Sequence, residues 1–141
     1  MRVLWIALAA LLVAGCGGTP APQITAQQVF DRLQKSGLVT NGRAVPAAAA
    51  DEPYAKCTDR LGFDMPGVDG LAGVVNICPK AAGDAIMAQP TVAPLEGALA
   101  GIRVDPYIYR SAGGTVIVTV VGLAPPDAAQ RIGNEVALIP E

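Results

Sequence analysis

The chain has 141 residues, of which 52% are hydrophobic and 4% aromatic, and its formal net charge is −2. No run of basic residues accompanies this charge, which argues against a nucleic acid as a partner. Because the chain contains no histidine, it lacks the base of Ser-His-Asp and Cys-His catalytic systems and a common ligand of zinc sites.

The first residues have the layout of a secretory signal. Arg2 supplies a short positive region, and Val3–Ala14 is an unbroken apolar run. As a helix, this run would be about 18 Å long, which is too short for a bilayer core of about 30 Å. Its length and flanks are typical of a signal peptide.

Cys16 directly follows two small residues in the stretch Val13-Ala14-Gly15-Cys16. This stretch, placed at the end of the apolar run, resembles the lipobox of bacterial lipoproteins. The resemblance implies that Cys16 takes a diacylglyceryl group and becomes the first residue after the signal is cut. Two or more acyl chains hold a protein stably at a membrane. The alternative is an ordinary secreted protein in which Cys16 occurs by chance.

Three segments follow from this interpretation. We expect a signal peptide at 1–15, the lipidated cysteine with a flexible tether at 16–23, and one globular domain at 24–141. The lipid on Cys16 would attach the protein to the cell membrane or the outer membrane, with the domain facing the periplasm or the exterior.

The strongest local pattern predicts a helix over 26–36. Thr25 is placed to cap it together with Gln28, three residues later, as a capping box. Gly37 can take the left-handed conformation that ends a helix. One face is apolar and is expected to pack on a sheet, although a partner-binding face is the alternative; it carries Val29, Phe30 and Leu33.

Two strands are predicted after a loop at Thr40–Pro53. They span Tyr54–Leu61 and Leu71–Cys78, and a stretch rich in turn-forming residues joins them. In an oxidising compartment Cys57 and Cys78 would form a disulfide. If they face each other directly, the hairpin is centred between residues 67 and 68, inside this turn. Free buried thiols are the alternative.

The second half is predicted to contain a short helix at Asp84–Gln89, a helical turn at Leu95–Ala100, a hairpin and a final helix at Asp127–Leu138. The final helix would bury Ala129, Ile132, Val136 and Ile139.

The hairpin would join Tyr107–Arg110 to Thr115–Val121 through Ala112-Gly113, with Tyr109 opposite Val116 and Tyr107 opposite Val118. Its core face would carry Tyr107, Tyr109, Val116, Val118 and Val120.

The order of these elements predicts an α+β fold. We expect an antiparallel sheet of about four strands with helices packed on one face, arranged as two αββ-like units and a C-terminal helix.

Few residues suggest chemistry. Asp59, Asp64 and Asp69 lie close together around the first turn and are candidates for acid–base catalysis. Asp64 and Asp69 are also candidates for calcium binding, but a solvated turn explains them more simply. Tyr54, Tyr107 and Tyr109 are candidates for an aromatic binding patch, but core packing explains Tyr107 and Tyr109 better because they face the valines. We therefore expect no catalytic residue, metal site or cofactor.

The function expected from these features is a small, lipid-anchored, non-enzymatic domain that binds or supports another cell-envelope protein. The alternative is a carrier that holds a small ligand in a cavity between the sheet and the helices. An enzyme that uses Asp59, Asp64 or Asp69 is the third hypothesis.

Overall fold

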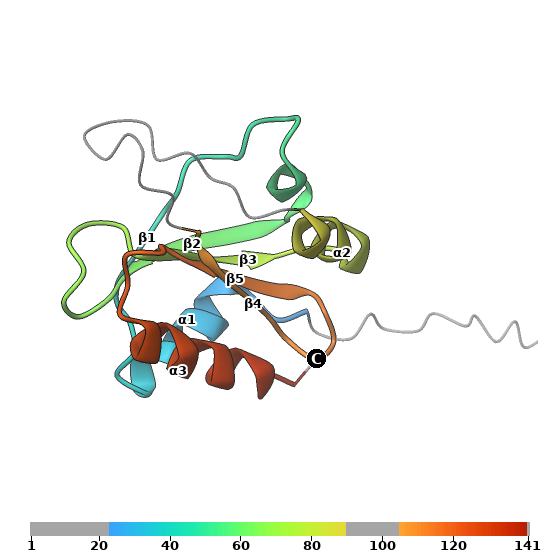
Figure 1. Ribbon diagram of the computed structural model, residues 1–141. Coiled ribbons are helices and arrows are strands. Elements are labelled where there is room, and N and C mark those ends of the chain that lie inside the picture. The colour runs from blue at the N-terminus through green and yellow to red at the C-terminus, as the bar shows by residue number, and fades with distance from the viewer. Residues whose placement is uncertain (1–22, 90–104, 141) are drawn as a thin grey trace, which may run out of the picture.

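The computed structural model describes residues 23–89 and 105–140. Within these ranges the chain forms a five-stranded antiparallel sheet and three α-helices (Figure 1). The elements in chain order are α1 (Ala26–Lys35), β1 (Thr40–Arg43), the 3-10 helix η1 (Pro53–Lys56), β2 (Asp59–Asp64), β3 (Gly73–Ile77), α2 (Lys80–Ala88), β4 (Tyr107–Arg110), β5 (Val116–Val120) and α3 (Pro126–Ala137). The strands lie side by side in the order β1-β2-β3-β5-β4. The predicted α+β class is confirmed, with one strand more than expected.

Several expectations concern residues that lie outside the described ranges. They are the signal peptide at 1–15, the lipidated Cys16 with all but the last residue of its tether, and the helical turn at Leu95–Ala100.

Helix α1 has the predicted caps. The Gln28 N–H donates to Thr25 Oγ1 over 3.2 Å, and the Thr25 N–H donates back to Gln28 Oε1 over 2.9 Å. After the helix, Gly37 takes a φ of +70°, and the Leu38 N–H donates to the Leu33 carbonyl over 3.0 Å. The capping box and the glycine stop thus fix both ends of the helix.

Strand β1 was not predicted, because its residues were assigned to a loop. All four of its residues are exposed, so it shows no alternation between buried apolar and exposed polar side chains. It pairs with β2 at Thr40↔Asp64 and Arg43↔Gly62, and a bulge separates the two pairs. Asn41, with a φ of +48°, lies at this irregularity.

The first hairpin begins later than predicted. Residues 54–56 belong to η1 rather than to a strand, because Pro53 is well suited to the first position of a helical turn. Strand β2 therefore starts at Asp59, and its pairs run from Asp59↔Ile77 to Phe63↔Gly73. In this register Cys57 and Cys78 are one residue away from being directly opposite each other. The predicted position of the hairpin centre is therefore wrong.

The second hairpin has the predicted faces in a different register. Tyr107 pairs with Val120 and Tyr109 with Val118, which is two residues away from the prediction. The loop is longer than expected, and Gly114 in it has a φ of +91°. Because side chains alternate with a period of two, a shift of two residues leaves every side chain on its predicted face.

The main core lies between the sheet and the pair α1 and α3, which cover the same face (Figure 1). Its largest fully buried side chains include Leu33, Phe63, Val75, Val118 and Ile132. Helix α3 buries the predicted Ala129, Ile132 and Val136, and Ile139, just beyond the end of the helix, is buried as well.

Helix α2 departs from the expected one-sided arrangement. It begins at Lys80 rather than Asp84, because the Pro79 carbonyl accepts the N–H groups of Ala82 and Gly83. With η1 it packs on the opposite face of the sheet at one end. A second, smaller cluster is buried there, made of Cys78, Ala82, Ile86 and Ile117.

Candidate functional site

The two cysteines of the domain lie in the second cluster. A disulfide joins Cys57 to Cys78, with an S–S distance of 2.08 Å. Cys78 is fully buried, and Tyr54 and Cys57 pack against the cluster that contains it. The bond therefore links the end of η1 to the end of β3, beneath α2, where it supports packing.

The three candidate carboxylates do not form a common site. Asp59 Oδ2 accepts the Ala26 N–H over 2.7 Å and so caps the start of α1 from strand β2. Asp64 pairs with Arg43 and accepts a hydrogen bond from Asn41 Nδ2 over 3.2 Å. Asp69 is exposed. Two of the three therefore have structural partners, on different elements.

No metal centre is evident in the described ranges. Among these residues no group of three or more Cys, Asp or Glu side chains is placed to hold a metal ion.

The three tyrosines lie on two faces of the sheet. The Tyr54 hydroxyl and Thr119 Oγ1 are 3.1 Å apart and share a hydrogen bond on the face covered by α2. Tyr107 and Tyr109 lie on the core face, with parallel rings whose centroids are 6.5 Å apart. The three tyrosines therefore form no common patch, and Tyr107 and Tyr109 pack against the main core beside α3, as the core-packing interpretation predicted.

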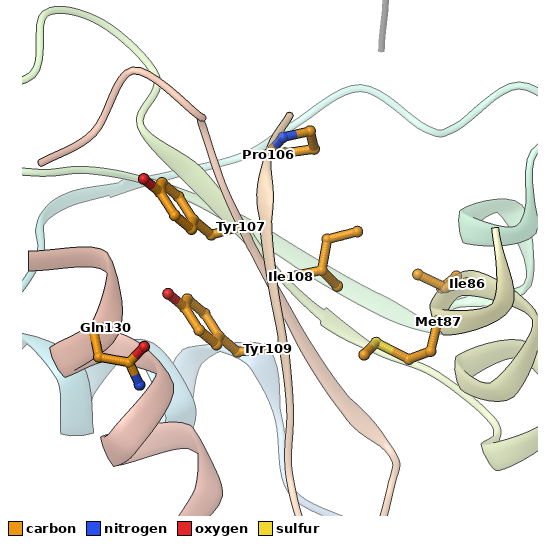
Figure 2. Close-up of a pocket in the computed structure, with 7 residues that line it drawn as sticks. All are labelled: Ile86, Met87, Pro106, Tyr107, Ile108, Tyr109 and Gln130. Atoms are coloured by element: carbon orange, nitrogen blue, oxygen red, sulfur yellow. The ribbon is translucent and has the colours of Figure 1, made fainter. Parts of the chain in front are cut away.

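A hollow that was not predicted from the sequence lies along the outer edge of β4. Its volume is about 380 Å³, and we call it the edge slot; it is lined by Ile86, Met87, Pro106, Tyr107, Ile108, Tyr109 and Gln130. Figure 2 shows Tyr107 and Tyr109 on the side of β4 that faces Gln130 of α3, and Ile108 on the side that faces α2. The edge slot is thus bounded by one helix from each face of the sheet.

Among the described residues, the side chains that line the edge slot are uncharged. They include aliphatic side chains, two phenol groups and one amide. Burial raises the pKa of Tyr109, and the neighbouring Tyr107 raises it further, so this hydroxyl is neutral at physiological pH. Because a charge removed from water without a partner is costly, this lining favours an uncharged ligand.

An ion-pair network fixes the helix that forms one side of the slot. Arg110 Nη2 lies 2.7 Å from Asp84 Oδ1, and Lys80 Nζ lies 3.1 Å from Asp84 Oδ2. Arg110 Nε also donates to the Gly114 carbonyl over 3.2 Å. The hydrogen bond from Arg110, followed by that from Lys80, holds the pKa of Asp84 below its usual range. The network joins α2 to the β4–β5 hairpin.

The sequence contained only part of the signal for this site. Tyr107, Ile108 and Tyr109 alternate as a strand should, which assigned their faces correctly. The strand order makes β4 an edge strand, and the position of α2 places Met87 beside it. Neither is encoded locally.

Comparison with protein-family models, with curated proteins and with solved structures finds no match for this chain. In the described part of the chain, no helix combines the length and apolar character needed to cross a bilayer.

Proposed function

We propose that this protein is a lipid-anchored domain of the cell envelope that binds another envelope protein and performs no catalysis itself. The observation that carries the proposal is the stretch Val13-Ala14-Gly15-Cys16, which follows Arg2 and a short apolar run. Lipid on Cys16 would hold the domain at the cell membrane or the outer membrane, facing the periplasm or the exterior.

The disulfide supports an extracytoplasmic location. Structural disulfides form and persist in oxidising compartments and are rare in the cytoplasm. The bond between the half-buried Cys57 and the buried Cys78 suits such a compartment.

The roles of the carboxylates support a binding function rather than an enzymatic one. A general acid or base must lie within reach of its substrate. Asp59 instead caps α1, and Asp64 is engaged by Arg43 and Asn41. The uncharged edge slot, in contrast, has the chemistry of a binding surface.

The anchor is tested by Cys16→Ser in the full-length protein. We expect the variant to lose acylation and to remain uncleaved or to leave the membrane, because serine has no thiol for the thioether link. Metabolic labelling with palmitate and partitioning into a detergent phase measure both effects. Gly18→Ser, in the same expected tether, is the matched control and should behave like wild type. Normal maturation and detergent partitioning of Cys16→Ser would contradict the lipid anchor.

The binding role is tested with the tagged, full-length protein after gentle solubilisation of the envelope. We expect one envelope protein to be recovered in every preparation, and mass spectrometry identifies it. If repeated preparations recover no reproducible partner, the proposed binding role is wrong.

A further inference from the structure

Among residues 23–89 and 105–140, strand β4 is an edge strand that is paired on one side only. Within the described residues, β5 is its single neighbour in the sheet. The Ser111 N–H donates to the Val116 carbonyl over 3.0 Å. Since backbone groups alternate in direction along a strand, Tyr109 and Tyr107 also point their N–H and C=O groups toward β5. Ile108 and Arg110 therefore point theirs outward.

The edge slot lies where a further strand would run. Its lining comes from both faces of β4, since Ile108 lies on one face and the two tyrosines on the other (Figure 2). A hollow that contacts both faces of an edge strand lies beyond that edge, in the plane of the sheet. A neighbouring strand would occupy this position, about 4.8 Å from β4.

We propose that an extended, uncharged segment of the partner protein binds in the edge slot as a sixth strand beside β4. This inference rests on the proposed function, and it names the surface and the chemistry of the partner. The backbone of the segment pairs with the outward groups of Ile108 and Arg110. Its side chains point alternately to the two faces of the sheet. On one face they contact Ile108 and Met87, and on the other they contact Tyr107 and Tyr109.

Two features of the slot limit the segment. In the described part of the chain, none of the seven side chains that line the slot is charged, so a charged residue in the segment would be desolvated without a partner among them. Pro106 has no N–H and β4 ends at Arg110, so the ladder spans about four residues. A short edge with a proline also restricts indiscriminate strand pairing.

The position of the partner is tested by photocrosslinking from the full-length, lipidated protein in intact envelopes. Gln130→p-benzoylphenylalanine places the photoreactive group at the slot, and Arg131→p-benzoylphenylalanine places it at a neighbouring exposed position of α3 outside the lining. We expect crosslinks from position 130 alone, and we expect the attached peptide to be an uncharged segment of one envelope protein.

The contribution of the slot is tested by capture of that protein with two variants. Met87→Glu adds a charge to the lining, whereas Leu71→Glu adds the same charge elsewhere at matched exposure, 43% against 42%. We expect Met87→Glu to lower capture by about tenfold or more and Leu71→Glu to leave it unchanged. Ile108→Pro removes one outward N–H while the hydrogen bonds to β5 remain, and it should weaken capture similarly.

The outcomes separate this inference from the proposed function. If wild type and Met87→Glu capture the partner equally, or if position 131 crosslinks as well as position 130, the strand inference is overturned and the binding role remains. Crosslinking to a second copy of this chain also overturns it. Should wild type capture no reproducible protein, the proposed function itself fails. If Ile108→Pro does not fold, Met87→Glu and the crosslinks still decide.

Discussion

At the scale of single residues, Asp59 shows how a carboxylate that suggests catalysis can serve the fold. Its Oδ2 accepts the N–H of Ala26, the first residue of α1, and its negative charge favours the positive end of the helix dipole. We expect Asp59→Ala to lower the free energy of unfolding by about 1 kcal/mol, measured by urea denaturation.

Asp69→Ala is the control for this prediction. Asp69 belongs to the same group of carboxylates but is exposed, and surface substitutions of this kind change stability by less than about 0.5 kcal/mol. Equal destabilisation by the two variants would show that the contact with Ala26 contributes nothing specific.

At the scale of elements, Asp84 connects α2 to the β4–β5 hairpin through Arg110. Its folded-state pKa lies below the ordinary value of 3.8 because of Arg110 first and Lys80 second. A lowered pKa means that the unfolded chain takes up the proton first as the pH falls. The contribution of Asp84 to stability is therefore complete above pH 3.8 and is lost as the pH falls through the folded-state pKa.

The pH dependence of Asp84→Asn tests this connection. We expect the variant to melt at a lower temperature than wild type above about pH 5, with a difference that shrinks as the pH falls below 4. Calorimetry across this range gives both curves, and Asp69→Asn is the exposed control. A difference that stays constant down to pH 2 would mean that the charge of Asp84 does not stabilise the fold.

Some of the individual helices and strands could be predicted from the sequence, and others could not. Helix α1 was predicted nearly to the residue because Thr25, Gln28 and Gly37 encode its ends locally. Strand β1 was missed because its side chains are all exposed and its pairing with β2 is a long-range property. The β4–β5 faces were predicted while the register was not, because alternation sets the face and the length of the loop sets the register.

At the scale of the whole molecule, the site depends on relations that no segment contains. The edge slot exists because β4 comes last in the strand order and because α2 and α3 lie on opposite faces beside it. All helices were expected on one face of the sheet, and that arrangement gives no reason to predict a hollow on both sides of an edge strand. The candidate carboxylates are close in sequence, but the fold gives Asp59 and Asp64 separate partners and leaves Asp69 exposed.

The disulfide also belongs to this scale, because it stabilises the smaller of the two buried clusters. Cys57 and Cys78 are 21 residues apart, and closing a loop of this length stabilises a fold by about 3 kcal/mol in the chain-entropy description. That is a large share of the roughly 5–15 kcal/mol that stabilises a domain of ordinary size.

We expect the Cys57→Ser/Cys78→Ser variant to fold, to melt at a lower temperature than wild type and to lose about 3 kcal/mol of its free energy of unfolding. Reduced wild type is the control, because it retains both sulfur atoms and separates loss of the bond from loss of packing. Since neither cysteine lines the edge slot, capture of the partner at low temperature should be unchanged. Mass spectrometry of non-reduced, alkylated protein from its native compartment gives the direct measurement, and two alkylated thiols would show that the bond does not form there.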